Sequence, residues 1–179
     1  MRVLAIDIGS SSIKSAMLEN ARVIGNIART PYQTQRDSLR SEVIADDLLD
    51  AFRKSVASVP DARNADIRAL SVMSPAWVAM DCNGTAITPL ITHQDRRSVE
   101  ESRTLIAEVG EYKLLGITGN LPFPGGISST TTRWMFRHHS ELRSHTDLVG
   151  HLNTFLIRQL TGARVIDPGN ASFTGLYLS

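Results

Sequence analysis

The opening stretch of the chain, an apolar run that ends in an acid and a glycine-serine turn, constrains the fold more than any other feature. Residues 3–8 are apolar except for Asp7, and Gly9 with three serines follows them directly. A short apolar run bounded by glycine and serine is typical of a buried strand. We therefore expect Asp7 to stand where this strand leaves the core, with its carboxylate able to meet solvent or a metal.

The turn itself carries groups suited to an anion. Gly9 can adopt positive φ, so that neighbouring backbone N–H groups point together and form an anion-binding concavity. Ser10, Ser11 and Ser12 add hydroxyl donors, and Lys14 adds a positive charge. An acid, a glycine, hydroxyls and a lysine in this order suit a clamp for magnesium and phosphate. A polar hairpin turn explains the same residues equally well, because glycine and serine dominate turns.

Composition excludes several classes of protein. The chain has 179 residues, enough for one domain that buries roughly 70% of its unfolded surface. Lysine plus arginine (19) balances aspartate plus glutamate (18), so no global field favours nucleic acid or an anionic membrane. Cys82 is the only cysteine, which fits a reducing compartment. No apolar run approaches the roughly 18 residues of a spanning helix, and the chain opens on a strand rather than a signal peptide. We expect a cytoplasmic protein.

Hydrophobic periodicity and turn signals predict an α/β domain. The expected strands are residues 3–8, 13–19, 22–29, 67–73 and 77–81, with a loop at 30–39. The expected helices run from residue 41 or 42 to Pro60, and over residues 98–109, 130–138 and 148–160. Three strands followed by alternating helices and strands give a mixed sheet.

The opening turn resembles the first phosphate loop of the actin-like ATPase superfamily. That superfamily includes sugar kinases as well as bacterial actin-like division and pilus-assembly proteins, so the turn alone names no function. It is neither a Walker loop nor a dinucleotide fingerprint, because the glycine spacing that these motifs need is absent.

Four later blocks resemble the FGGY family of carbohydrate kinases. Gln94-Asp95-Arg96-Arg97 follows an apolar run, as in the family's Asn/Gln-Asp-x-Arg block. Residues 117–142 are similar to its "TG…PG…LLW…..PE" stretch, residues 156–162 to "L..RLTG", and residues 167–177 to "D.S.AS.TGLYD". Because the blocks occur in the family's order behind the right phosphate loop, the chain is identified as a member, most similar to xylulokinase-like and gluconate-kinase-like proteins.

This resemblance implies both a fold and an activity. The fold would be an RNase H-like lobe with a mixed five-stranded sheet and helices on both faces. The activity would be transfer of the γ-phosphoryl group of ATP, with Mg²⁺, to a hydroxyl of a sugar, sugar acid or polyol. Residues 1–179 would form part of the N-terminal domain, with the C-terminal domain absent and the general-base aspartate lying downstream. The chain alone would then be inactive, and a homodimer is possible for the full-length protein.

The resemblance also assigns residues to sites. The nucleotide residues would be Asp7, which would also hold the metal, with Gly9, Ser10, Ser11, Ser12 and Lys14. The substrate residues would be Met73, Ser74, Pro75, His93, Gln94, Asp95 and Arg97. Pro75 stands where xylulokinases typically carry histidine, and His93 stands where the family usually has tryptophan, so the identity of the sugar stays open. A helix cap and a surface salt bridge are the alternative for Asp95 and Arg97, and a surface lysine for Lys14.

Two other functions are compatible with these residues. The opening turn would suit a non-catalytic actin-like assembly protein that binds ATP, although the blocks from Pro89 onward favour a kinase. A non-catalytic sugar-binding remnant would keep those blocks without the catalytic half. The histidines have no metal-ligand spacing with acids or with Cys82, so we expect no metal other than nucleotide magnesium.

Overall fold

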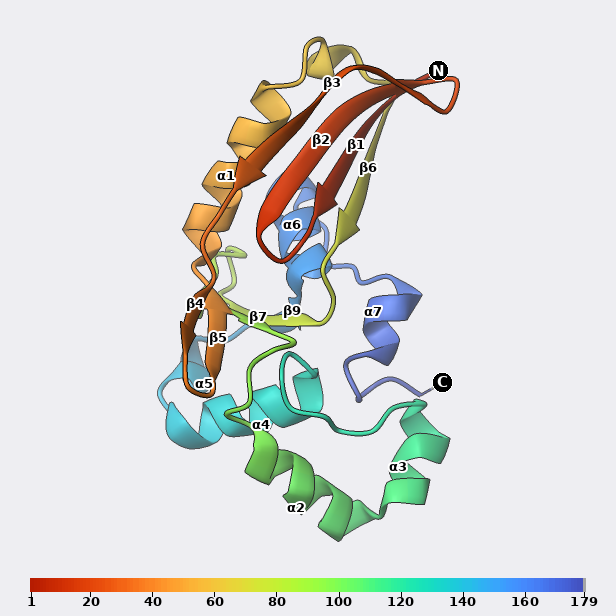
Figure 1. Ribbon diagram of the computed structural model, residues 1–179. Helices are drawn as coiled ribbons and strands as arrows, with labels where there is room; N and C mark the ends of the chain where they lie inside the picture. Colours follow the sequence, from red (N-terminus) through yellow and green to blue (C-terminus); the bar gives the residue numbers. More distant parts are fainter. Residues whose placement is uncertain (179) are drawn as a thin grey trace. The chain divides into compact units, whose positions relative to one another are not determined.

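Two separate β-sheets organise the chain in the computed structural model, which describes residues 1–178 (Figure 1). They belong to two compact units that interleave along the sequence. Unit 1 comprises Met1–Thr34 and Ile44–Met73, and unit 2 comprises Gln35–Val43 and Ser74–Ser179.

The sheet of unit 1 is mixed. Its strand order is β3-β2-β1-β6, where β1 is Arg2–Ile8, β2 is Ser12–Glu19, β3 is Arg22–Pro31 and β6 is Ile67–Val72. β1 and β3 run antiparallel to β2, whereas β6 runs parallel to β1. Asn20 and Ala21 both have positive φ (50° and 61°), the conformation that a two-residue hairpin turn requires.

One helix packs on this sheet. α1 (Ala45–Ala57) contacts β2 and β3, and its buried residues include Leu48, Ala51 and Phe52 at helical spacing. The Ser55 hydroxyl of this helix lies 2.8 Å from the Ser15 hydroxyl of β2, so the two buried polar groups satisfy each other. A short 3₁₀ turn, η1 (Ala62–Asn64), follows before β6.

Unit 2 is built on an antiparallel sheet with the order β4-β5-β8-β7-β9. The strands are β4 (Gln35–Asp37), β5 (Arg40–Val43), β7 (Ala76–Met80), β8 (Leu90–Thr92) and β9 (Leu148–His151). The helices are α2 (Val99–Val109), α3 (Glu111–Thr118), α4 (Ser128–His138), α5 (Leu142–His145), α6 (Leu152–Thr161) and α7 (Pro168–Ser172). Every residue of β7 is buried, and Trp77 packs with Ala79, Ile91 and Met135 in the core.

The predicted α/β class and mixed sheet are confirmed, but the strand count is wrong. The mixed sheet has four strands, and the fifth predicted strand lies in unit 2 as β7. β7 pairs with β8 and β9, and residues 148–151 of β9 were expected to start a helix. The apolar residues Leu148 and Val149 fit the hydrophobic repeat of a helix as well as that of a strand. Only their pairing with β7 selects the strand.

A second correction concerns residues 35–43. They form the β4–β5 hairpin, with Ser38 at positive φ, instead of a loop and a helix start. β5 extends because Glu42 and Val43 pair with β8, and α1 begins only at Ala45. The helix α3 was not predicted.

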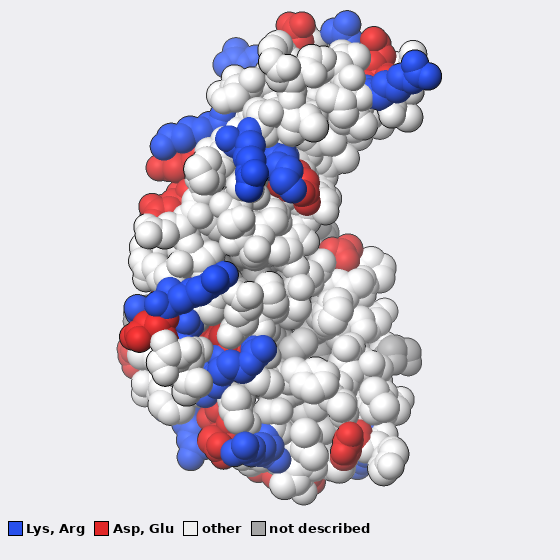
Figure 2. All heavy atoms as spheres, in the orientation of Figure 1, with Lys and Arg blue, Asp and Glu red and all other residues white. Residues whose placement is uncertain are grey.

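Charged side chains of both signs lie on the surface. Figure 2 shows basic and acidic side chains interspersed over the visible face. Within residues 1–178, no helix combines the length and the apolar character needed to cross a bilayer.

Candidate functional site

The predicted acid and lysine of the nucleotide site meet across two strands of unit 1. Asp7 and Lys14 are directly opposite in the β1–β2 pairing, and Oδ2 of Asp7 lies 3.2 Å from Nζ of Lys14. Each side chain is about half exposed, at 51% and 50%. Ser71 of β6 is in register with Asp7, so its hydroxyl belongs to the same face. The sequence did not single out Ser71, because its position depends on the parallel pairing of β6.

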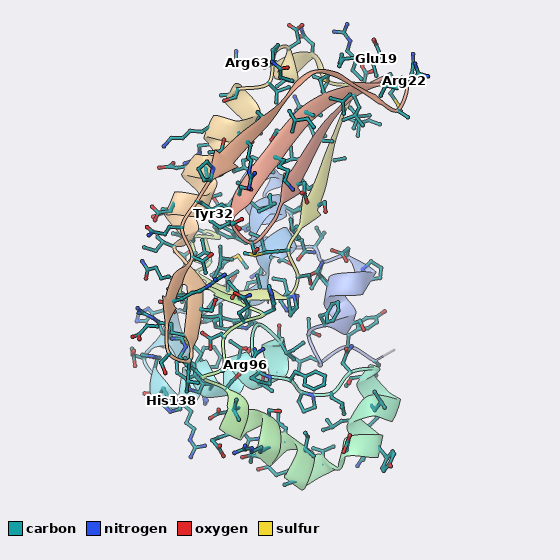
Figure 3. The ribbon with its side chains drawn as sticks, viewed as in Figure 1. Glu19, Arg22, Tyr32, Arg63, Arg96 and His138 are labelled. Carbon is teal, nitrogen blue, oxygen red and sulfur yellow. The ribbon has the colours of Figure 1, made fainter. Side chains whose placement is uncertain are left out.

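The loop between β1 and β2 is held from one side by residues 32–34. The phenol of Tyr32 donates to the carbonyl of Gly9, and its backbone N–H donates to the carbonyl of Ser11 at 3.2 Å. The hydroxyl of Thr34 donates to the carbonyl of Ser10 at 3.0 Å. Burial raises the pKa of Tyr32 to about 12, so the phenol stays a donor at neutral pH. Figure 3 labels Tyr32 just beyond the end of β3.

The conformation of Gly9 differs from the expectation. Gly9 does not have positive φ, and a Cβ there would lie 3.6 Å from the carbonyl oxygen of Ser12, an ordinary contact. Hydrogen bonds therefore shape this loop, including one of 3.1 Å from the Gly9 N–H to the Ser12 carbonyl. The Ser12 side chain is buried, and its hydroxyl accepts from Nε of Arg29 at 3.2 Å. Ser10 and Ser11 are exposed, so their hydroxyls are the more accessible donors.

The donors of this loop fit a magnesium–phosphate ligand. Mg²⁺ prefers oxygen ligands and is usually bound through one or two carboxylates together with substrate phosphates. Asp7 supplies one exposed carboxylate, and Lys14 supplies a charge that can neutralise phosphate. No group of three or more His, Cys, Asp or Glu side chains that could hold a metal occurs among residues 1–178. A metal here would therefore need phosphate oxygens or water to complete its coordination.

Unit 2 contains a second candidate site, a cavity of about 450 Å³. Its lining includes two predicted substrate residues and several that the sequence did not single out: Pro75, His93, Arg96, Phe123, Pro124, Gly125, Ile127 and Phe173. Figure 3 labels Arg96, which lies in the turn between β8 and α2. A cavity of this size is in the range of small-molecule sites.

Two glycines bring the walls of this cavity together. Gly125 and Gly126 have φ of +87° and +82°. A Cβ at Gly125 would lie 2.5 Å from the carbonyl oxygen of His93, and one at Gly126 would lie 2.8 Å from that of Pro75. The glycine loop thus packs directly against the backbone of both predicted substrate segments, which leaves no room for a side chain.

Asp95 and Arg97 are engaged within the protein. Asp95 is 2% exposed, and its carboxylate accepts from the backbone N–H of Ser41 at 2.9 Å and from Nε of Arg97 at 2.9 Å. Arg97 also donates to Glu42 at 2.8 Å, and its guanidinium lies 4.7 Å from the centre of the Trp134 ring. Burial opposes the charge of Arg97, but the hydrogen bond and charge of Asp95, then those of Glu42, raise its pKa. These contacts favour the salt-bridge alternative for both residues.

The remaining predicted substrate residues have different surroundings. Gln94 and His93 are exposed. Met73 belongs to unit 1, where its sulfur lies 3.8 Å from the Tyr32 phenol. The Ser74 hydroxyl, in unit 2, donates to Oδ1 of Asn170 at 2.7 Å.

The buried His151 contacts the same oxygen of Asn170 as Ser74 does. His151 is fully buried, with Nδ1 3.3 Å from Oδ1 of Asn170 and Nε2 3.2 Å from the Ser128 hydroxyl. An amide oxygen only accepts, so Nδ1 carries the proton and Nε2 accepts from Ser128. Asn170 also donates to Asp167 at 2.8 Å. The network therefore connects the Ser74 turn to the N-termini of α4, α6 and α7, and sequence spacing gave no sign of it.

This network predicts a loss of stability in acid. Burial lowers the pKa of His151 below its ordinary value of 6.5. Below that pH the unfolded chain binds a proton that folded His151 does not, so the free energy of unfolding decreases as pH falls through this window. We expect urea midpoints to decrease from pH 7.5 to pH 5, and less steeply in His151→Gln, which itself costs about 1–3 kcal/mol. The exposed His145→Gln is the control, and equal pH slopes in all three proteins would contradict the prediction.

Comparison with known proteins identifies the family of this chain. The family model described as "FGGY family of carbohydrate kinases, N-terminal domain" matches residues 2–178. The chain is 25% identical to a xylulose kinase of Streptomyces coelicolor, covering 99% of this chain and 37% of that protein. It is 27% identical to a gluconokinase of Bacillus subtilis, covering 97% of this chain and 34% of that protein.

The fold is also that of the family. A xylulose kinase structure from Rhodospirillum rubrum aligns with a TM-score of 0.88 and 24% identity, over 99% of this chain and 38% of that one. The chain therefore spans about a third of the length of the relatives that it matches. The match over residues 2–178 shows that this chain belongs to the FGGY family of carbohydrate kinases.

Proposed function

We propose that the protein containing this chain transfers the γ-phosphoryl group of ATP to a hydroxyl of a small carbohydrate. The observation that carries the proposal is the pairing of Asp7 with Lys14 beside a loop whose carbonyls are held from behind by residues 32–34. The relatives named above are kinases of xylulose and of gluconate. Together with a 26% identical glycerol kinase of Myxococcus xanthus, they support a sugar, sugar acid or polyol as the substrate class.

In this proposal the chain positions phosphates and neutralises charge. Asp7 would hold Mg²⁺, directly or through water, and Lys14 would stabilise charge on the transferred group. The exposed Ser10 and Ser11, with Gly9 and Ser12, would border the phosphates. The bound metal would supply further neutralisation of the phosphate oxygens.

The sugar would bind in unit 2. His93, Pro75 and Gln94 remain candidate contacts, together with Ser74. Asp95 and Arg97 would act by holding the His93 turn in place. We propose that residues 1–179 form part of the N-terminal domain, that the aspartate acting as general base comes from a downstream C-terminal domain, and that the protein works in the cytoplasm, where ATP is available.

Replacement of the acid tests the proposal. In the complete protein, Asp7→Asn should lower kcat for sugar-dependent ADP formation on the order of 100-fold, because it removes the metal-binding charge. Asp50→Asn is a matched control, since Asp50 is an exposed acid on α1 that pairs with Arg53. Unchanged kcat in Asp7→Asn would refute the assignment. The 179-residue chain alone should form no ADP in response to sugar.

The actin-like assembly function is not favoured, because the family match extends over residues 2–178 rather than over the opening loop alone. Sedimentation with ATP separates the two functions. Nucleotide-dependent polymers that form without any effect of sugar would support assembly instead.

A further inference from the structure

The unit 2 cavity carries positive charge without a compensating acid. Its lining contains Arg96 and His93 but no Asp or Glu. Among residues 1–178, Arg96 forms no salt bridge, and the neighbouring carboxylate of Asp95 is committed to Arg97 at 2.8 Å. Arg96 is therefore an exposed positive charge at the wall of a cavity. The adjacent acid, Asp95, is already paired with Arg97.

The guanidinium of Arg96 is also fixed in orientation. Nη1 donates to the carbonyls of His93 at 2.8 Å and Asp95 at 2.9 Å. A Cβ on Gly125 would lie 2.9 Å from this nitrogen, so the glycine loop packs against it. Within the described residues, Nε and Nη2 have no hydrogen-bond partner. Those two nitrogens form one edge of the guanidinium, the edge that binds a carboxylate through two parallel hydrogen bonds.

The rest of the lining suits a carbon chain. Phe123 and Phe173 are 59% and 41% exposed, and Pro75, Pro124 and Ile127 complete an apolar wall. Aromatic and proline faces pack well against C–H groups. The lining contains no Asp or Glu that would repel a negatively charged ligand. A ligand with its own carboxylate would fill the free edge of Arg96.

We propose that this site selects an aldonate, a polyhydroxy carboxylate, whose carboxylate binds the Nε–Nη2 edge of Arg96. The inference rests on the proposed kinase function and specifies its substrate class. Arg96 occupies the variable position of the Gln94-Asp95-x-Arg97 block, so the motif itself does not require an arginine there.

The test compares substrates that differ only in the charged group. In the complete protein, kcat/KM from coupled ADP formation is measured for gluconate against sorbitol, for xylonate against xylitol, and for xylulose. We expect each aldonate to exceed its polyol at least about 10-fold, as one charged hydrogen-bonding pair implies.

Arg96→Gln should lower kcat/KM for the aldonates about 10–100-fold, mainly through KM, and lower the polyol values by a much smaller factor. Arg103→Gln, an exposed arginine of α2, is the control. Arg96→Lys keeps the charge but lacks the bidentate edge, and should recover activity only in part. If Arg96→Gln does not fold, the test rests on the wild-type ratios of kcat/KM for each aldonate over its polyol.

Two outcomes separate failure of this inference from failure of the proposed function. Polyols or xylulose phosphorylated as well as the aldonates, or an Arg96→Gln loss that is equal for all substrates, would overturn the aldonate assignment and leave the kinase function standing. No ADP formation with any compound would overturn both.

Discussion

Gly125→Ala will destabilise unit 2 by roughly 3 kcal/mol or more, because it combines backbone strain with overpacking. The residue has φ of +87°, where an L side chain is strained. Its Cβ would also lie 2.5 Å from the carbonyl oxygen of His93 and 2.7 Å from that of Asp95. Both obstacles are backbone atoms, which cannot rotate away as a flexible side chain would.

Gly162→Ala separates the two causes. Gly162 has φ of +77° at the end of α6, but a Cβ there would come no closer than 3.8 Å, to Nη1 of Arg158. It should therefore cost only about 1–2 kcal/mol. Trp77 and Trp134 are the only tryptophans and both belong to unit 2, so urea unfolding followed by fluorescence reports on this unit. Equal losses in the two variants would show that the contact at Gly125 contributes nothing.

Arg97→Met will cost about 3–5 kcal/mol, because it leaves the buried carboxylate of Asp95 without its cation and Glu42 with only Arg40, at 3.5 Å. Asp95 is 2% and Glu42 7% exposed, and both depend on Arg97 for charge-assisted hydrogen bonds. Methionine keeps most of the apolar contact with Trp134, so the loss measures charge rather than volume. The same fluorescence-detected unfolding gives the free energy.

Two further variants test the electrostatic cause. Arg103→Met removes an exposed i,i+3 partner of Glu100 and should change stability by less than about 0.5 kcal/mol. Combining Arg97→Met with Asp95→Asn and Glu42→Gln removes the uncompensated charges and should recover part of the loss. If that combination is less stable than Arg97→Met alone, buried charge is not the cause.

Local sequence patterns were sufficient to predict the first three strands of unit 1. β1, β2 and β3 are consecutive, and their turns carry their own signals in Gly9 and in Asn20-Ala21. The β4–β5 hairpin was missed because its extended form depends on β8 and on Arg97, which lie far along the chain. Residues 148–151 were ambiguous for the same reason: their pairing partner β7 decides between strand and helix.

For the candidate sites, too, the sequence indicated residue types but not the tertiary contacts. The residue types of the β1–β2 loop suggested a phosphate-binding role, but its backing by Tyr32 and Thr34 is a tertiary contact, and Gly9 does not adopt the positive φ that a glycine allows. Asp95 matched a family motif, although burial and hydrogen bonds occupy its carboxylate. Arg96 was not predicted as a site residue because it occupies the variable position of the motif. Only the structure shows that it lines a cavity.

The interleaving of the two units has a consequence for folding during synthesis. Unit 1 is complete once Met73 has left the ribosome. The β4–β5 hairpin is by then already made, but its edge partner β8 (Leu90–Thr92) has yet to appear. Arg97, which pairs with Glu42 of this hairpin at 2.8 Å, follows later still. The nascent chain must therefore carry an unpaired strand edge until the centre of the second sheet is translated.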